Sequence, residues 1–414
     1  MKLSDILRER GYVYQFSGDN LETVVDTPRT LYLGVDPTAD SMHVGQLMGV
    51  LVLRRFVEAG NKLIVLVGGG TGMIGDPGGK SAERNLLDDE TVKHNTEALK
   101  KQFTQLLGGV PFEMVNNADW LHPLNYMEFL RDIGKHFTVN EMIKRDTIRP
   151  RLETPDQSIS YTEFSYMLLQ AYDFLELHTR YGCDLQVGGS DQWGNILPGV
   201  DLIRRKTGEQ AYAFSWPLLV DGAGKKFGKS EGNAIWLDPK KTSPFQFYQF
   251  WLNVDDQMVH ELLFKMTLLS QEEIISIMQK HSANPGERLA QKTLAHEVTA
   301  LVHGPDNAEE AETASIALFG AHSFTDLDLD TVALLTREAP SCVAEPGNDL
   351  LDLLVFSTLA TSKREARQFL EDGAITINGQ KITESRPLEE GDFIKDVVLL
   401  RRGKRGVALL TLLQ

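Results

Sequence analysis

The chain has 414 residues, 42% of them hydrophobic and 24% charged, which is typical of a globular protein with two or three domains. No run of about 18 apolar residues occurs, and the N-terminal residues lack the apolar core of a signal peptide, so we expect neither a membrane span nor export. The formal net charge of −16 excludes a protein that is basic all over, but it does not exclude a local nucleic-acid site.

The first predicted unit is a βαβ unit. Residues 30–35 and 62–69 are short apolar runs typical of buried parallel strands, and residues 44–60 between them repeat their apolar positions at helical spacing. The fold class that we predict is therefore α/β, with a Rossmann-like parallel sheet in the first domain. In such sheets ligands bind at the carboxyl ends of the strands, often where a helix begins.

The loop after the first strand concentrates polar side chains, namely Asp36, Thr38, Asp40, Ser41 and His43. Taken alone, this loop is equally well explained as a turn in which Ser41 or Asp40 caps the following helix. Its place at a strand end also makes it a candidate site for a phosphate group.

A glycine-rich segment follows at residues 68–84. Its Gly79-Lys80-Ser81 resembles the end of a phosphate-binding P-loop, but that pattern needs a glycine where this chain has Ile74. We therefore reject the P-loop interpretation.

Residues 163–178 predict a helix that carries Tyr166, Gln170 and Asp173 on one face, because these residues are four and three positions apart. This polar stripe is either a solvent-facing side or a buried recognition surface. The next run, residues 184–189, is typical of a strand that ends at a glycine turn.

A second basic loop, residues 222–236, contains Lys226 and Lys229 in a glycine-rich setting. A solvated lysine loop is the usual interpretation of such a pattern. Two such loops beside a βαβ unit instead favour a common anionic ligand, since lysine is a mobile point charge suited to a polyphosphate.

The remaining sequence predicts three further parts. Residues 241–336 have the apolar stripes of helices, residues 337–349 are typical of a linker with two prolines and a glycine, and residues 350–414 predict a small α+β module. The Rossmann-like domain then covers residues 1–240.

Several motifs resemble those of one family, the class I aminoacyl-tRNA synthetases. Residues 34–46, GVDPTADSMHVGQ, resemble the HIGH signature of that family, and residues 226–230, KFGKS, resemble its KMSKS signature. Within the family, the bacterial tyrosyl-tRNA synthetases are similar throughout, along FLRDIGKHFTVNEMI, YTEFSYMLLQAYDF, GGSDQWGNI and KTSPFQFYQFWLN. The similarity runs in order from Leu31 to about Gln414, and the motifs together are far more specific than any one of them.

The resemblance implies a tyrosine–tRNA ligase that works in two steps. The enzyme would activate L-tyrosine with ATP to tyrosyl-adenylate, releasing pyrophosphate, and would then transfer tyrosine to the 3′ end of its cognate tRNA. ATP would be a substrate that arrives with Mg²⁺, and we expect no tightly bound cofactor and no metal site in the protein. Because no covalent enzyme intermediate is needed, the work is placement and stabilisation of developing charge.

The resemblance also implies roles for individual residues. In the tyrosine site, Tyr32 and Asp173 would bind the phenol, while Asp76, Tyr166 and Gln170 would bind the ammonium group. The expected catalytic residues, which contact or clamp the phosphates, are Thr38, His43, Lys80, Arg84, Lys226 and Lys229. The expected ATP site comprises Gly34, Asp36, His43, Gln46, Gly189, Asp191, Gln192 and Lys229.

Two positions depart from the family pattern. Gln46 replaces the second histidine of the HIGH signature, and it can donate a hydrogen bond but carries no charge. Leu33 stands where many relatives have a cysteine that touches the ribose. We expect both departures to affect ATP affinity and not the class of reaction.

The parts after residue 240 would bind RNA. The resemblance makes residues 241–336 an anticodon-binding domain, and residues 350–414 resemble a small RNA-binding module first named for a ribosomal protein. Residues 395–405 contain five basic residues and one acidic residue, which is either a solvated turn or a tRNA contact; the resemblance favours the contact. The expected tRNA-binding residues are Lys395, Arg401, Arg402, Lys404 and Arg405.

The expected partners are L-tyrosine, ATP, tRNA(Tyr) and a second copy of the chain, with no membrane. Residues 120–145 are the candidate interface of this homodimer, which the resemblance alone implies. Cys183 and Cys342 are too few for a disulfide framework, so we expect a reducing, cytoplasmic location.

Two other functions remain as alternatives. A tryptophanyl-tRNA synthetase is the nearest enzyme, but Asp173 together with Tyr32 favours a phenol over an indole. A catalytically silent RNA-binding protein derived from a synthetase is the second alternative, and the retained Thr38, His43 and two lysines argue against it.

Overall fold

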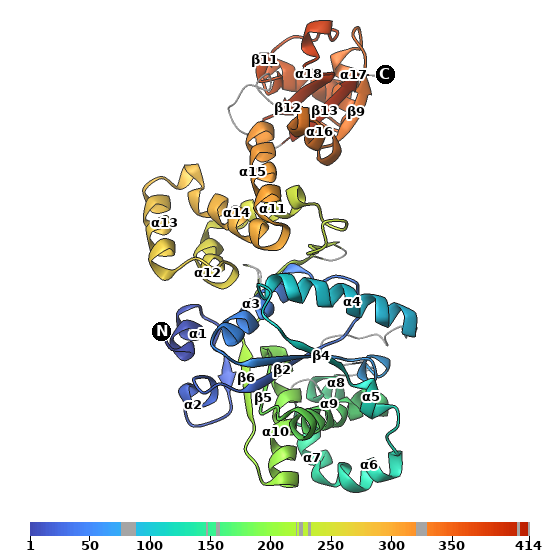
Figure 1. Ribbon diagram of the computed structural model, residues 1–414. Helices are drawn as coiled ribbons and strands as arrows, with labels where there is room; N and C mark the ends of the chain where they lie inside the picture. The colour runs from blue at the N-terminus through green and yellow to red at the C-terminus, as the bar shows by residue number, and fades with distance from the viewer. Residues whose placement is uncertain are drawn as a thin grey trace. The chain divides into compact units, whose positions relative to one another are not determined.

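The computed structural model describes residues 1–75, 88–145, 148–154, 158–220, 222, 227–230, 233–319, 329–403 and 406–412 (Figure 1). The chain divides into two compact units. The first consists of Met1–Asp238 with Asp255–Ala290, and the second of Pro239–Val254 with Gln291–Gln414.

The first unit is built on a six-stranded sheet with the order β1-β6-β5-β2-β3-β4. All neighbours are parallel except β1, which pairs with β6 in the antiparallel direction. The predicted α/β fold with a parallel sheet is therefore confirmed. The strands are β1 (Gln15–Phe16), β2 (Thr30–Val35), β3 (Lys62–Val67), β4 (Glu113–Asn116), β5 (Leu185–Gly189) and β6 (Tyr212–Trp216).

The strand order reverses between β2 and β5. From β2 the chain continues to β3 and β4 on one side, whereas β5 and β6 lie on the other side. Such a switch point leaves a crevice at the carboxyl ends of the two central strands, where open α/β sheets bind their ligands.

Helices cover both faces of this sheet (Figure 1): α3 and α4 lie on one side, and α9 and α10 pack together on the other. The helix α9 begins at a capping box between Ser160 and Glu163 and ends at Gly182, whose φ of 65° suits glycine. The helices of this unit are α1 (Leu3–Glu9), α2 (Leu21–Val25), α3 (Val44–Glu58), α4 (Asp89–Leu106), α5 (Ala118–Leu121), α6 (Tyr126–Asp132), α7 (Val139–Met142), α8 (Arg149–Glu153), α9 (Tyr161–Tyr181), α10 (Trp193–Thr207), α12 (Asp256–Met266) and α13 (Gln271–Ala283).

The second unit contains a group of helices and a small α+β module. The helices are α11 (Pro244–Leu252), α14 (Leu289–His303), α15 (Pro305–Phe319) and α16 (Leu329–Glu338). The module has the helices α17 (Leu350–Phe356) and α18 (Lys363–Glu371) and a five-stranded sheet with the order β11-β10-β12-β13-β9. Its strands are β9 (Ser341–Ala344), β10 (Ile375–Ile377), β11 (Gln380–Ile382), β12 (Val397–Arg402) and β13 (Gly406–Leu412).

The segment expected to be a linker is partly a strand. Residues 341–344 form β9, which pairs with β13 in parallel, and the backbone N–H of Leu409 donates to the carbonyl of Pro340 at 2.8 Å. Ala344 is buried in the module's own apolar core. The prolines and glycine that predicted a linker flank this strand, and its partner lies 68 residues later in the chain (Ser341 pairs with Leu409), beyond the reach of local sequence patterns.

None of the helices in the described part of the chain is long and apolar enough to cross a membrane.

Candidate active site

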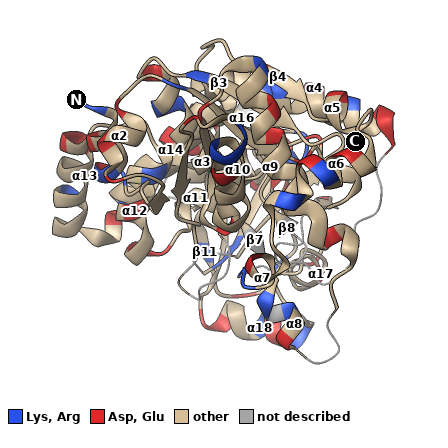
Figure 2. Ribbon diagram, turned by 90° about the horizontal axis from the view of Figure 1, so that it is seen from below, with Lys and Arg blue, Asp and Glu red and all other residues tan. Residues whose placement is uncertain are grey.

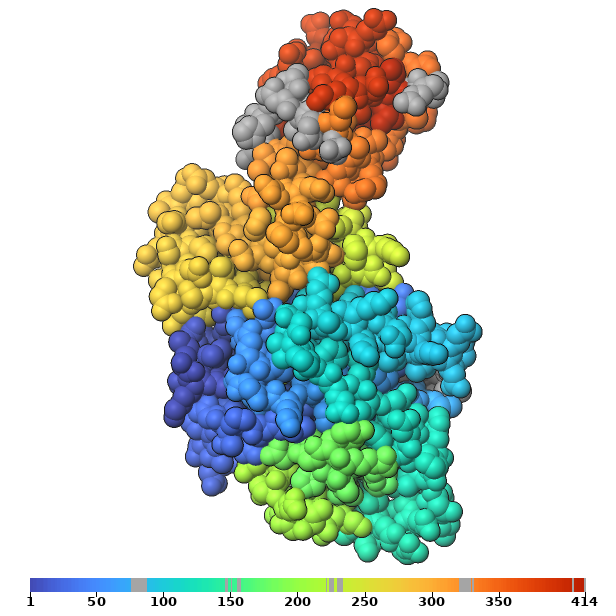
Figure 3. All heavy atoms as spheres, viewed as in Figure 1, coloured from blue at the N-terminus to red at the C-terminus, as the bar shows by residue number. Residues whose placement is uncertain are grey.

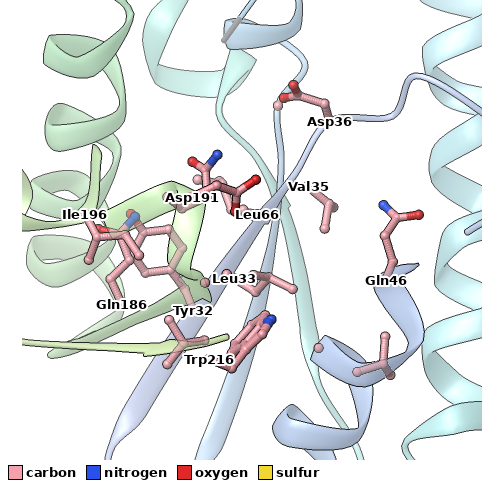
Figure 4. A pocket seen from close by; sticks show the side chains of 18 of the residues that line it. Tyr32, Leu33, Val35, Asp36, Gln46, Leu66, Gln186, Asp191, Ile196 and Trp216 are labelled. Carbon is pink, nitrogen blue, oxygen red and sulfur yellow. The ribbon is translucent and has the colours of Figure 1, made fainter. Parts of the chain in front are cut away.

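A cavity of about 380 Å³ opens at the switch point between β2 and β5 (Figure 4). It is lined from β2, the loop after it, the start of α3, one face of α9, and the ends of β5 and β6. The residues expected from sequence that line it are Tyr32, Gly34, Asp36, Thr38, His43, Gln46, Tyr166, Gln170, Asp173, Gly189, Asp191 and Gln192. The structure therefore brings together residues that are as much as 160 positions apart in the chain.

One end of the cavity is formed by two almost fully buried side chains, the Tyr32 phenol and the Asp173 carboxyl group. Tyr32 on β2 is 1% exposed and Asp173 on α9 is 2% exposed. The Tyr32 hydroxyl has no hydrogen-bond partner among the described residues, and its ring lies 5.2 Å from that of Phe174, centroid to centroid. Burial raises the pKa of Asp173 to about 7, and burial together with the Asp173 charge raises the pKa of Tyr32 well above 10.

Two residues that the sequence did not single out hold the Asp173 carboxylate. The Asn117 side-chain amide donates to one oxygen at 2.9 Å, and the Trp120 indole N–H donates to the other at 2.7 Å. Both hydrogen bonds lower the pKa of Asp173 and so oppose the effect of burial. Asn117 is fixed in turn, because its amide oxygen accepts from the backbone N–H of Gly70 at 2.8 Å.

The other end of the cavity is the N-terminus of α3. His43 is the N-cap: its Nδ1 accepts from the backbone N–H of Gly45 at 3.1 Å, and the Gln46 side-chain oxygen accepts from the backbone N–H of His43 at 3.1 Å. The expectation that Ser41 or Asp40 caps this helix is wrong. The Ser41 hydroxyl is instead buried, donating to its neighbour's carbonyl and accepting from the backbone N–H of Asp238.

Residues 227–228 of the KFGKS segment lie against this helix end. The Phe227 backbone N–H donates to the carbonyl of Leu219 at 2.9 Å, and Gly228 has a φ of +73°. A Cβ at Gly228 would lie 2.1 Å from Cγ2 of Val44, so this close approach requires glycine. Only the backbone of Lys229, in the short strand β7 (Lys229–Ser230), is described, and Asp76, Lys80, Arg84 and Lys226 lie outside the described residues.

Between the two ends, the chain leaves β5 at Gly189 and enters a 3-10 turn with Asp191 and Gln192. A Cβ at Gly189 would lie only 2.8 Å from Oδ1 of Asp191. Because glycine has no side chain, the backbone can approach the cavity at this position. On α9, Tyr166 is buried and Gln170 is half-buried, so the polar stripe of this helix faces the cavity and not solvent.

Three of the five basic residues expected to bind tRNA lie among the described residues, and two of these three contact the protein itself. The Arg401 guanidinium is half-buried and donates to the carbonyl of Ala317 at 2.7 Å, and that of Arg402 donates to the carbonyl of Leu359 at 2.6 Å. Lys395 is exposed, whereas Lys404 and Arg405 lie outside the described residues.

Comparison with known protein families gives two matches that cover most of the chain. Residues 26–320 match a family model described as tRNA synthetases class I (W and Y). Residues 331–410 match a model described as the Tyrosine--tRNA ligase SYY-like C-terminal domain.

Individual relatives extend over nearly the whole chain. Tyrosine--tRNA ligase of Roseiflexus castenholzii is 48% identical over 421 residues, covering 99% of each chain, and Tyrosine--tRNA ligase 1 of Vibrio parahaemolyticus is 45% identical over 408 residues, covering 98% of this chain and 97% of its own. Among solved structures, a C-terminally truncated mitochondrial tyrosyl-tRNA synthetase of Aspergillus nidulans superposes with a TM-score of 0.67 at 32% identity. That match covers 77% of this chain and 94% of the other.

Proposed function

The chain belongs to the class I tRNA synthetases of the tryptophan and tyrosine group, and from this premise we propose how it works as a tyrosine–tRNA ligase. A tyrosine carboxylate oxygen attacks the α-phosphorus of ATP, and the bond from that phosphorus to the bridging oxygen breaks, releasing pyrophosphate. A ribose hydroxyl at the 3′ end of tRNA then attacks the carbonyl carbon of tyrosyl-adenylate, and AMP leaves. The observation that carries this assignment is a single cavity with buried Tyr32 and Asp173 at one end and a helix N-terminus at the other.

The buried pair suits a phenol. The substrate hydroxyl donates to the Asp173 carboxylate and accepts from the Tyr32 hydroxyl, which otherwise has no partner among the described residues. Phenylalanine would leave the buried Tyr32 hydroxyl unpaired and would deprive the buried Asp173 carboxylate of its bond to the substrate, which costs more than a missing contact in an apolar pocket. Discrimination of this kind reaches ~10⁵ in tyrosyl-tRNA synthetases, an established value for this enzyme family.

The helix N-terminus suits the phosphates. The dipole of α3 favours negative charge at this end, and His43 stands here with Thr38 in the loop before it. We propose that Lys226 and Lys229 reach the departing pyrophosphate from the loop that lies against this helix end, together with Lys80 and Arg84. We also propose that Asp76, Tyr166 and Gln170 bind the ammonium group of the substrate tyrosine.

The nucleoside of ATP would lie between these two ends, over Gly34 and Gly189, with the ribose at Asp191 and Gln192. Asp36 lies near the phosphates, in the loop that precedes Thr38. Gln46 is part of this site through the helix cap, because its side chain holds the backbone of His43. We propose that Mg²⁺ arrives with ATP as part of the substrate, and that the enzyme acts in the cytoplasm, where ATP and tRNA meet.

For tRNA binding we propose the domain roles expected from sequence: catalysis in residues 1–240, anticodon binding in residues 241–336, and a further RNA contact in residues 350–414, beyond the segment 337–349. Because Arg401 and Arg402 contact the protein itself, we propose that Lys395 and the helix α18 make the main contacts of this module with tRNA. Arg364 and Arg367 on α18 are exposed, Lys363 beside them forms an ion pair with Asp352 at 2.6 Å, and the basic residues of this helix are blue in Figure 2. A basic helix face of this kind binds phosphates of the RNA backbone.

We also propose a homodimer through the segment 120–145. Tyr126, Met127 and Val139 of this segment are 58%, 71% and 61% exposed, and a dimer interface here would bury them. Sedimentation should give twice the chain mass, and Met127→Glu should shift the protein toward monomer. A monomeric wild-type protein would contradict this proposal.

The direct test of the proposed function is pyrophosphate exchange into ATP. Purified protein should exchange with tyrosine and scarcely at all with phenylalanine or tryptophan. Equal exchange with phenylalanine would contradict the phenol site, and exchange with tryptophan alone would support the nearest alternative enzyme.

Tyr32→Phe should reduce the ratio of kcat/KM for tyrosine to kcat/KM for phenylalanine in pyrophosphate exchange. Losing one hydrogen bond to the phenol should lower kcat/KM for tyrosine by roughly 3- to 10-fold and leave phenylalanine unchanged. Tyr12→Phe is a matched control, because Tyr12 is also fully buried but its hydroxyl donates to the carbonyl of Lys265. If both variants keep wild-type selectivity, Tyr32 does not bind the phenol.

A further inference from the structure

The indole of Trp216 occupies a place in the cavity wall that only glycine neighbours allow. Trp216 ends β6 and is 7% exposed, and Figure 4 shows it beside Leu33 among the side chains that line the cavity. A Cβ at Gly49 of α3 would lie 2.8 Å from Cζ2 of this ring, so any larger residue at position 49 would displace it.

The N–H edge of the same ring lies near the end of β5. A Cβ at Gly189 would lie 3.7 Å from Nε1 of Trp216 and 2.8 Å from Oδ1 of Asp191. The indole N–H and the Asp191 carboxylate thus both lie near Gly189, where the cavity wall carries no side chain.

A sugar hydroxyl matches this arrangement, because it accepts and donates at once. The point beside Gly189 lies between the phenol end and the phosphate end of the cavity, where the ribose of ATP must sit if the proposed function holds. The neighbouring Leu33 side chain is apolar and offers no hydrogen bond to the sugar. We propose, on the basis of the proposed function, that Trp216 donates a hydrogen bond to a ribose hydroxyl and thereby selects ribonucleoside triphosphates.

Trp216→Phe tests this directly, because it removes the N–H and keeps an aromatic ring in place. In pyrophosphate exchange, kcat/KM for ATP should fall roughly 3- to 10-fold while KM for tyrosine stays unchanged. The same comparison is made with 2′-deoxy-ATP and 3′-deoxy-ATP. With the analogue that lacks the accepting hydroxyl, wild type and variant should be equal.

An equal loss with ATP and with both analogues would overturn the proposal, since the ring would then act only by packing. Trp193→Phe is the matched control, because Trp193 does not line the cavity, and it should leave all three nucleotides unaffected. Failure of the wild-type protein to exchange with tyrosine would instead refute the proposed function. In that case, the ribose contact is still tested by measuring the affinities of the wild-type protein and the Trp216→Phe variant for ATP and its deoxy analogues by calorimetry.

Gly49→Ala tests the same contact by moving the indole of Trp216 instead of replacing it. Its methyl group should displace the indole and lower kcat/KM for ATP in the wild-type background. In a Trp216→Leu background the added methyl meets no ring, so the further loss should be much smaller. Equal losses in both backgrounds would show that Gly49 and Trp216 do not act together.

Discussion

Replacing Asp173 by asparagine is expected to lower kcat/KM for tyrosine in pyrophosphate exchange by roughly 10²- to 10⁴-fold. The substitution removes the charge that accepts the substrate phenol, a hydrogen bond worth roughly 1.5–3 kcal/mol. It also turns one acceptor into a donor, which would then face either the Trp120 indole N–H or the Asn117 amide. An unsatisfied buried donor costs about 1–3 kcal/mol more.

The control is the activity with phenylalanine. Because phenylalanine has no hydroxyl, its weak exchange should not fall with that of tyrosine, and the ratio of the two kcat/KM values should fall by the same factor as kcat/KM for tyrosine. A parallel loss for both amino acids, accompanied by a lower melting temperature, would mean that Asp173 only supports the fold.

The ionisation of Asp173 should also appear in a pH profile. Burial raises its pKa to about 7, so kcat/KM for tyrosine should rise with pH up to about 7 as the carboxylate forms. Asn117→Ala removes a hydrogen bond that lowers this pKa, and should therefore move the inflection to higher pH. The free energy of unfolding should change with pH in the opposite direction. Because the pKa of Asp173 in the folded protein lies above the unfolded value of 3.8, the contribution of this carboxyl group to stability falls as the pH rises from about 3.8 to about 7.

The parts of the site that could be predicted are those on regular elements with strong local patterns. Helical spacing placed Tyr166, Gln170 and Asp173 on one face, and the structure turns that face into the cavity. Asn117 and Trp120 could not be predicted in this way. They follow the four-residue strand β4, which has no clear period, and their role depends on contact with a residue more than fifty positions later.

The helix cap illustrates a different limit. Local preference favours serine or aspartate as the N-cap of α3, yet the Ser41 hydroxyl is engaged with residues distant in the chain: it also accepts from the Gln102 amide at 3.0 Å. His43 takes the cap because its ring nitrogen can reach the backbone N–H of Gly45. Tertiary contacts thus override a local rule at the point where the phosphates are expected to bind.

Removing residues 320–414 is expected to leave tyrosine-dependent exchange nearly intact and to lower tRNA charging by at least about 100-fold. Figure 3 shows the C-terminal residues, orange to red, as a compact body, and its apolar core is formed among residues 344–410 alone. A cut inside the segment 337–349 would leave β9 without its partner β13, so the cut is placed after Phe319. The cavity lies entirely before this point, which is why adenylate formation should survive.

A point variant in the intact chain separates loss of tRNA contact from loss of structure. Arg364→Glu together with Arg367→Glu changes two exposed positions on α18 and leaves the buried Ala366 and Leu370 in place. Each arginine that contacts a phosphate should contribute about one unit to the dependence of tRNA affinity on log salt concentration, so this dependence should weaken by about two units. Exchange with tyrosine should remain at the wild-type rate in the same preparation. If neither the truncation nor the double variant changes charging or its salt dependence, the module makes no contact with tRNA, and its basic residues are only a solvated face.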